Sequence, residues 1–162
     1  MLAHGLSVVF CGLNPALSAA REGHNFSSRS NRFWRVLHFS GFTPRLLAAK
    51  DEREILAYGI GLTSAVTRPT RSAGELKVSD YLAAAPALEQ KIRIVAPAYI
   101  AFLGKPAYAA INHNAHIDWG KQPGIFAGTS VWVLPNPSGL NRAFDLESLV
   151  THYRQLRLAC KA

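Results

Sequence analysis

The sequence contains little cysteine, few acidic residues and no long apolar runs. Cysteine occurs only at Cys11 and Cys160, so neither a disulfide framework nor a paired-cysteine metal site is expected. The longest apolar stretches, such as 99–103 and 131–134, are too short to cross a bilayer. The amino terminus has no basic region followed by an apolar core, so no secretory signal is expected. A soluble cytoplasmic protein is therefore predicted.

The chain has 10 aspartates and glutamates and 18 lysines and arginines, which gives a formal net charge of +8. This balance favours a polyanionic partner, either nucleic acid or an anionic membrane surface. Hydrophobic residues make up 49% and charged residues 17% of the chain, which suits a packed core and excludes general disorder. The length of 162 residues predicts one domain over residues 1–162.

Apolar, β-branched segments alternate with segments of helical spacing. Strands are predicted at 6–13, 99–103 and 130–134, with a strand or an extended loop at 59–65. Helices are predicted over 31–41, 44–56, 79–94, 106–111 and 146–158, the last one capped by Asp145. This alternation indicates an α/β domain with a mostly parallel sheet. In such sheets ligands bind beyond the carboxyl ends of the strands, where the polar motifs after Leu13 and Leu134 lie.

The first polar motif, Gly12-Leu13-Asn14-Pro15, ends the first strand. Pro15 restricts Asn14 to extended backbone, so the Asn14 carboxamide is expected to project over the sheet edge. An ordinary Asn-Pro turn is the alternative. No Gly-x-Gly-x-x-Gly or Walker pattern follows the strand, which argues against a nucleotide-cofactor fold.

The second motif runs from Asn136 to Arg142 and surrounds Leu140 with turn residues, among them Ser138 and Gly139. Leu140 is either the buried anchor of a solvated loop or an apolar wedge that enters a base stack. In the second case, the neighbouring groups are expected to hold phosphates. A lone leucine in a loop is more commonly a buried anchor, but the polar neighbours of Leu140 leave little room for burial, which favours the wedge.

The third motif is a basic stretch over 21–35, in which arginines are interleaved with aromatic residues. Its charged residues are Arg21, Arg29, Arg32 and Arg35 against Glu22 alone. Basic side chains beside aromatic ones suit backbone binding and base stacking. Phe33 and Trp34 are expected in a helix core, whereas Phe26 lies in the polar loop without a helical partner at matching spacing.

Other candidates carry weaker signals. His113 and His116 have no further ligand nearby, so no metal site is predicted. A Gly-x-Ser-x-Gly elbow for a serine nucleophile is absent. Asp80 and Glu22 are lone carboxylates, expected to be solvated, and assistance to water activation is the alternative for each.

Taken together, several stretches resemble the mismatch-specific uracil-DNA glycosylase and thymine-DNA glycosylase branch of the uracil-DNA glycosylase superfamily. They are VVFCGLNPALS at 8–18, NRFW at 31–34, GIGLTSAVTRPT at 59–70, LGK at 103–105, WGKQP at 119–123 and VWVLPNPSGLNR at 131–142. They occur in the family's order and cover nearly the whole chain. The bacterial mismatch-specific members are the most similar, because the last motif reads Asn-Pro-Ser-Gly-Leu.

The resemblance implies a three-layer α/β/α sandwich that acts as a monomer on double-stranded DNA with G·U or related mismatches, and not on membranes. It also implies that the enzyme rotates the damaged pyrimidine into a pocket and cleaves its N-glycosidic bond without a metal or cofactor. Asn14 is implied to position the attacking water, and Phe26 to stack on the base. The base pocket is implied to contain Gly12, Leu13, Phe26, Asn31 and Ser64. The DNA-binding residues are implied to be Asn136, Ser138, Gly139, Leu140 and Arg142. Of these, Gly139, Leu140 and Arg142 match the wedge that fills the space left by the base and meets the opposite guanine.

The chain departs from the family pattern near this pocket. Ala16 stands where glycine is usual, and Ala19 resembles the thymine-specific form rather than the bacterial serine. Ser64 occupies a position that is lysine in the bacterial form and asparagine in the thymine-specific form. The preferred base among uracil, thymine and ethenocytosine therefore stays open.

Two other classes of function compete with a glycosylase. A non-catalytic module that recognises mismatches in duplex DNA explains the charge and Leu140, but leaves Asn14 and Phe26 without a function. A small-molecule α/β enzyme explains the loops at the sheet edge, but not the basic excess, and it lacks a phosphate-binding signature.

Overall fold

Five strands form one sheet in the order β2-β1-β3-β5-β4 in the computed structural model, which describes residues 1–162. The strands are β1 (Val8–Gly12), β2 (Ile60–Ser64), β3 (Tyr99–Leu103), β4 (Gly120–Phe126) and β5 (Thr129–Leu134). β1 runs parallel to β2 and β3, and β3 runs parallel to β5. Only β4 is antiparallel, where it pairs with β5. The predicted mostly parallel sheet is confirmed.

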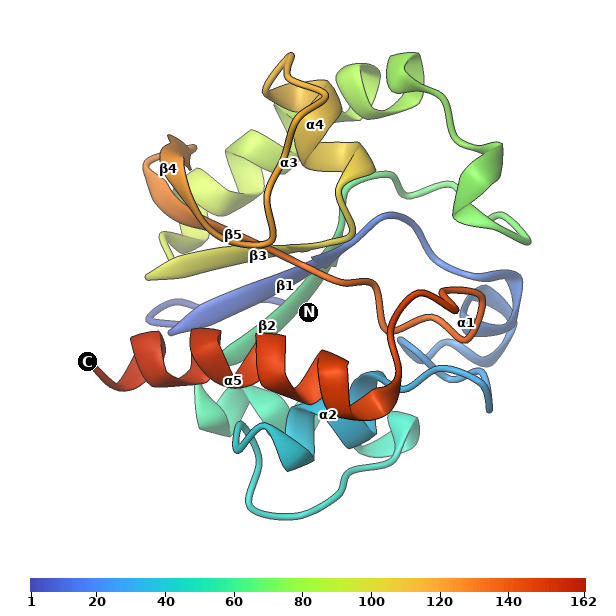
Figure 1. Ribbon diagram of the computed structural model, residues 1–162, viewed down its shortest axis with the longest axis vertical. Helices are drawn as coiled ribbons and strands as arrows, with labels where there is room; N and C mark the ends of the chain where they lie inside the picture. The colour runs from blue at the N-terminus through green and yellow to red at the C-terminus, as the bar shows by residue number, and fades with distance from the viewer.

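Helices cover both faces of this sheet (Figure 1). One face carries α3 (Val78–Val95) and α4 (Pro106–Ile111). The other face carries α2 (Phe33–Phe39), the 3₁₀ helix η1 (Ala49–Tyr58) and α5 (Leu146–Lys161). The short α1 (Leu17–Glu22) and the 3₁₀ turn η2 (Ala73–Glu75) lie beyond one end of the sheet. The arrangement confirms the three-layer α/β/α prediction.

Two apolar cores form because successive side chains of a strand point to opposite faces of the sheet. In β1, Val9 and Cys11 join the core under α3 and α4, whereas Val8 and Phe10 join the core under α2 and α5. All four side chains are fully buried. The ring of Phe10 meets that of Phe33 edge-on, with centroids 5.6 Å apart, which holds α2 against the sheet.

The strand order places a topological switch point beside β1. The chain leaves β1 for β2 through the layer of α2, and then crosses to β3, on the other side of β1, through α3 in the opposite layer. Connections that leave neighbouring strand ends in opposite directions open a crevice between them. The loops after Leu13 and Leu134 both begin at this edge of the sheet, as predicted.

The segment 44–56 does not form the predicted regular helix. Residues 44–48 are irregular, and a 3₁₀ helix begins only at Ala49. Leu47 is buried in the core beside α2, while Leu46 is half-exposed, so burial of one leucine decides the path of this segment. Pro86 lies inside α3, on its exposed side, and the helix continues through it to Val95.

β4 and α1 were not predicted, for two different reasons. β4 contains Pro123 and Gly124, and its pairing with β5 shifts register between Lys121 and Ile125. An irregular edge strand of this kind accommodates a proline, which has no N–H to donate. α1 has no buried residue, so it shows no apolar stripe that a sequence pattern would detect.

Both edges of the sheet have features that hinder pairing with a further strand. At the β4 edge, the side chains of Lys121 and Pro123 are exposed and the ladder is irregular. At the β2 edge, the N–H of Leu62 donates to the main-chain oxygen of Met1 at 2.9 Å, so part of the outer ladder of β2 is already paired.

The remaining global features concern membranes and thiols. None of the helices combines the length and the apolar character that a membrane span needs. Cys11 and Cys160 are both free thiols. Cys11 is fully buried in the core, and this burial raises the pKa of its thiol, which disfavours the reactive thiolate.

Candidate functional site

A pocket with about 740 Å³ of empty space, including the part open to solvent, lies at the carboxyl ends of the strands. The predicted residues that line it are Gly12, Leu13, Asn14, Phe26, Asn31, Ser64, Asn136, Ser138 and Leu140. Gly139 lines only an adjoining groove, which it shares with Leu17 and Leu140, and Arg142 lines neither. The fold thus brings most of these residues, from segments far apart in the sequence, to one place.

The Asn14 carboxamide is held in one orientation by two hydrogen bonds. Its Nδ2 donates to the main-chain oxygen of Arg68 at 2.9 Å and to Thr70 Oγ1 at 2.7 Å. The Thr70 hydroxyl in turn donates to the main-chain oxygen of Ser72 at 2.8 Å. Both N–H groups of the amide are therefore occupied, whereas Asn14 Oδ1 accepts nothing from the protein. This oxygen is available to a donor that enters the pocket.

Thr70 is a pocket residue that sequence reasoning did not single out. It is buried and lies 56 residues from Asn14 along the chain. An isolated parallel bridge between Ala16 and Thr70 brings the two segments together, and the Thr70 N–H donates to the oxygen of Pro15 at 3.2 Å. The only signal in the sequence is the family-like stretch 59–70, since a contact at this separation depends on the tertiary fold.

Carboxylates do not take part in the pocket, whose lining contains no Asp or Glu. Asp80 instead caps α3, where its Oδ2 accepts the N–H of Lys77 at 2.7 Å and its Oδ1 lies 3.4 Å from Arg68 Nη2. The hydrogen bond from Lys77, helped by the charge of Arg68, lowers the pKa of Asp80. Glu22 is exposed at the end of α1. Neither carboxylate lines the pocket, so that alternative is not supported.

Phe26 forms an aromatic wall of the pocket in a strained backbone conformation. Its φ of 54° lies in the left-handed region, which a residue with a bulky side chain rarely adopts. The ring stacks on Phe33 at a centroid distance of 4.1 Å, so Phe26 has a packing partner after all. The preceding Asn25 donates through its backbone N–H and its Nδ2 to Glu52 Oε2, at 2.8 and 3.0 Å. These contacts hold the ring beside Gly12, where a Cβ would lie 3.8 Å from it.

Asn31 and Ser64 lie on different elements around the same pocket. Asn31 Oδ1 accepts the N–H of Phe33 at 2.9 Å, which supports the start of α2, whereas the N-cap position itself is occupied by Arg32. Ser64 ends β2 and pairs in register with Gly12. Both side chains are half-buried, and their remaining polar groups can serve a bound molecule.

The loop 136–142 presents Leu140 to solvent. Asn136 Oδ1 accepts the N–H of Ser138 at 2.9 Å, and Asn141 Nδ2 donates to the oxygen of Asn136 at 2.9 Å. The Leu140 N–H donates to Ser138 Oγ at 3.2 Å. With its polar groups engaged in this way, the loop leaves Leu140 70% exposed, so the buried-anchor interpretation is wrong. Arg142 is also exposed.

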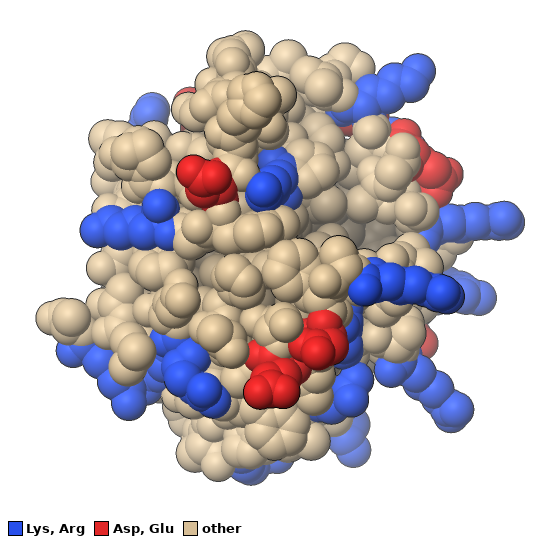
Figure 2. All heavy atoms as spheres, viewed as in Figure 1, with Lys and Arg blue, Asp and Glu red and all other residues tan.

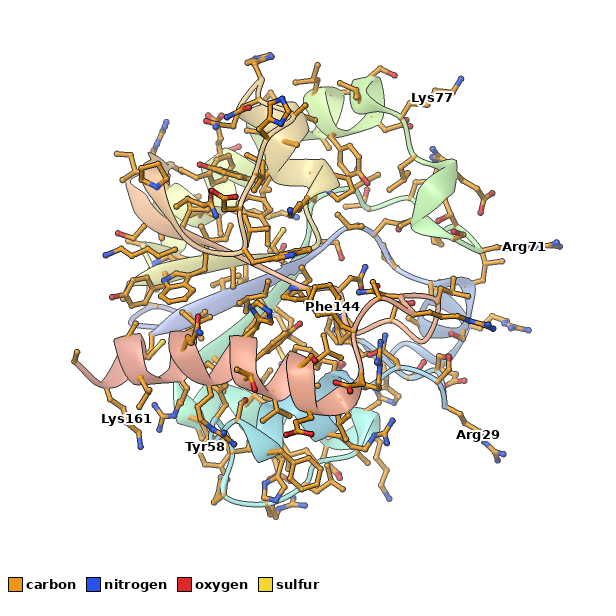
Figure 3. All side chains as sticks on the ribbon, in the orientation of Figure 1. Arg29, Tyr58, Arg71, Lys77, Phe144 and Lys161 are labelled. Carbon is orange, nitrogen blue, oxygen red and sulfur yellow. The ribbon has the colours of Figure 1, made fainter.

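Basic side chains gather on the side of the molecule that carries α1, at the right-hand edge of Figure 2. Arg71 lines both the pocket and the groove, and Figure 3 shows Arg71 and Arg29 projecting outward on this side. Arg21 and Arg35 of the basic stretch are exposed as well. Arg32 differs, because its guanidinium donates to main-chain oxygens of a neighbouring loop. Its grouping with the exposed cations is therefore wrong.

Gly139 packs against Ser30 so closely that no side chain fits. A Cβ built on Gly139 would lie 2.4 Å from Ser30 Cβ and 2.7 Å from the Ser30 oxygen. We expect Gly139→Ala to lower the free energy of unfolding by about 1–3 kcal/mol through overpacking, as measured by denaturant titration. Gly74→Ala is the matched control, since its Cβ would meet only Ser72 Oγ at 3.5 Å. Equal losses in the two variants would contradict a special role of this contact.

No group of three or more His, Cys, Asp or Glu side chains is placed to hold a metal ion. Comparison with protein families gives a match to the Uracil DNA glycosylase superfamily over residues 2–157. The matched range contains all five strands, every residue that lines the pocket and the helices of both layers, except for the last turn of α5.

Proposed function

The chain belongs to the uracil DNA glycosylase superfamily, whose members are DNA glycosylases, and we propose that it excises uracil mispaired with guanine from duplex DNA. In this proposal the enzyme is monofunctional and belongs to the mismatch-specific and thymine-specific branch. It rotates the mispaired base into the pocket, hydrolyses the N-glycosidic bond and leaves an abasic site. The stretches 8–18 and 131–142 support that branch.

The observation that carries this proposal is the clamped Asn14 amide in a pocket without carboxylates. An amide has no usable basicity, so Asn14 cannot take a proton from water. Its free Oδ1 can instead orient a water molecule by accepting a hydrogen bond from it. Holding a nucleophile in the right position supplies several kcal/mol of catalysis.

A water that is oriented but not deprotonated fits a largely dissociative reaction. The bond between C1′ and the base nitrogen breaks first, and its electron pair leaves with the uracil anion. The oxocarbenium-like sugar is then captured at C1′ by the water oxygen, and the water proton is released to solvent. Backbone N–H groups near the pocket stabilise the departing anion. Such an enzyme is expected to be slow and to require a good leaving group, as uracil is compared with a normal base.

The pocket and its rim supply the remaining steps of the proposal. Phe26 offers a ring face for the flipped base, and Leu140 enters the space that the base leaves in the duplex. Flipping costs least at a mispaired base, which favours G·U over A·U. Gly139 and Arg142, beside the wedge, are proposed to meet the opposite guanine, with Asn136 and Ser138 on the DNA-facing side of the loop.

One assay tests the proposal against its rivals. The protein is incubated with a labelled G·U duplex, the product is treated with alkali, and strand cleavage at an abasic site is measured. Cleavage at the uracil position is the expected result. Binding without cleavage at excess protein would favour a non-catalytic mismatch-binding module. Neither binding nor cleavage would favour a small-molecule enzyme.

The wedge role of Leu140 gives a prediction with two readouts. Because the side chain is 70% exposed, Leu140→Ala is expected to change the melting temperature of the free protein very little. It should weaken binding to G·U duplex and to abasic product duplex by about tenfold, since the unstacked step loses its apolar filler. Ile125→Ala is the control, because Ile125 is an apolar residue on β4 that is 72% exposed, and it should change neither readout. A large drop in melting temperature with unchanged affinity would exclude the wedge.

The same assay addresses substrate breadth. Duplexes with thymine or ethenocytosine opposite guanine, compared with G·U, rank the bases that the pocket accepts. Ser64 and Ala19 line the pocket at positions where the family varies. If uracil is not the base that is excised fastest, these are the residues to exchange. Action as a monomer and a cytoplasmic location stay predictions.

A further inference from the structure

Arg32 makes an unusual set of contacts for a residue in a basic stretch. Its Nη2 donates to the oxygens of Ser138 and Asn141, each at 2.9 Å, and its Nε donates to the oxygen of Pro137 at 3.3 Å. Its Nη1 donates to the oxygen of Phe144. The backbone N–H of Arg32 also donates to Pro137, at 3.0 Å. One side chain therefore holds four main-chain oxygens of the segment 137–144.

These contacts fasten the loop that carries Leu140 at several points along its length. Tyr153 of α5 fixes the start of the same loop, because its hydroxyl donates to the oxygen of Pro135 at 2.9 Å. Arg32 has no carboxylate within salt-bridge distance, so its hydrogen-bond donors are directed to main-chain oxygens, and its charge acts on the carboxylate of Asp145 only through space. Between Pro135 and Phe144, the long apolar side chain left free toward solvent is that of Leu140.

The chain neighbours of Arg32 belong to the wall of the pocket. It follows Asn31, which lines the pocket, and precedes Phe33, on which Phe26 stacks. The contact between Gly139 and Ser30 joins the same two segments. Arg32 thus stands between the groups that receive a base and the loop that presents Leu140.

We propose that Arg32 is a positioning residue that sets the wedge Leu140 at a fixed distance from the base pocket. Resting on the proposed function, this inference means that insertion of Leu140 and capture of the flipped base share one preformed geometry. A loop ordered before binding does not lose conformational freedom in the complex, and affinity rises accordingly. A loop that must order itself on DNA would weaken the specific complex even with Leu140 present.

Arg32→Lys separates this geometry from charge. Lysine keeps the positive charge, but its compact ammonium lacks the planar fork that reaches several acceptors at once. Arg157→Lys is the matched control, because Arg157 also donates to a main-chain oxygen, that of Gly41 at 2.8 Å, in a loop outside the pocket and groove. Any loss specific to Arg32→Lys then reports on the wedge loop.

A double-mutant cycle provides the test. Affinity for a duplex with guanine opposite an abasic-site analogue is measured for wild type, Arg32→Lys, Leu140→Ala and the double variant. Arg32→Lys should weaken binding by about tenfold in wild type and by less than about twofold in Leu140→Ala, because Arg32 acts through Leu140. Arg157→Lys should have no effect in either background. Equal losses from Arg32→Lys in both backgrounds would overturn the proposal.

A second readout removes any effect of a lower folded fraction. At saturating protein, the fluorescence of 2-aminopurine next to the lesion reports unstacking in the bound complex. A smaller rise with Arg32→Lys than with wild type, matching Leu140→Ala, is expected, and a full rise would overturn the positioning role. An Arg32→Lys chain that does not fold would overturn it too, since Arg32 would then serve the whole fold. Because both readouts need binding only, a wild type that binds without cleaving would overturn the proposed activity and leave this inference standing.

Discussion

Asn14→Ala is expected to lower the single-turnover rate of uracil excision from a G·U duplex by about 10²–10³, the usual cost of removing one orienting group from a preorganised site. The variant removes Oδ1, the oxygen left free when Nδ2 bonds Arg68 and Thr70. Duplex affinity should stay nearly unchanged, because Asn14 is directed to a water and not to the DNA backbone. Rate and affinity are measured on the same labelled duplex.

The control for Asn14→Ala is Asn112→Ala, at an exposed asparagine that ends α4 outside the pocket. It makes the same chemical change and should leave both readouts at the wild-type level. An Asn14→Ala rate within about threefold of wild type would remove Asn14 from the catalytic centre. A rate loss accompanied by an equal loss of affinity would instead place Asn14 in DNA binding.

Salt is expected to weaken DNA binding by about 10² between about 50 and 200 mM, for a protein that neutralises about four phosphates. The cations for this role are Arg21, Arg29, Arg35 and Arg71, all exposed. Each neutralised phosphate contributes about −0.9 to the slope of log affinity against log salt concentration. Arg32 is left out because its donors are engaged by the protein. Fluorescence anisotropy titrations with a labelled duplex measure this slope.

Single substitutions sharpen the salt prediction. Arg29→Ala should make the slope less negative by about one, because one released counterion is lost. Arg157→Ala removes the same charge from α5, beside Gly41, and should leave the slope unchanged. A flat slope for the wild-type chain would contradict DNA as the partner.

Two of the buried strands could be predicted almost to the residue, whereas β1 spans Val8–Gly12 and is shorter than the predicted 6–13. β3 has the predicted bounds of 99–103, and β5 begins one residue before the predicted strand. Parallel strands covered on both faces are continuous apolar runs, so their ends are marked by the first polar or turn residue. The start of α5 was equally clear, because Asp145 Oδ1 accepts the N–H of Ser148 at 2.8 Å, as a capping aspartate should.

Elements without an apolar signature could not be predicted. β4 buries only Gly120, Gln122 and Phe126, and its Pro123 indicates a loop in any local analysis. The irregular path of 44–48 depends on where Leu47 finds the core. In both cases the rest of the fold decides the local structure, and a short window of sequence does not contain that information.

The site residues, too, could be predicted only where their local sequence is unusual. Asn14, Phe26 and Leu140 could be singled out because each is an unusual residue in its local setting. Thr70 and the positioning contacts of Arg32 could not, since they join segments separated by 56 and by more than 100 residues. Arg32 was even assigned to the wrong surface, because charge alone does not show whether a guanidinium faces phosphates or carbonyl oxygens.

The shielded edges of the sheet have a consequence for self-association. An unpaired, regular edge strand is a template on which a second chain can add a strand, and such addition leads to dimers through continuous sheets or to aggregates. Here Pro123 has no N–H to offer, Lys121 brings a charge, and the shifted register bends the outer ladder of β4. At the opposite edge, Met1 already accepts the N–H of Leu62. The chain can therefore concentrate along a polyanion, where local protein concentrations are high, without its sheets joining edge to edge.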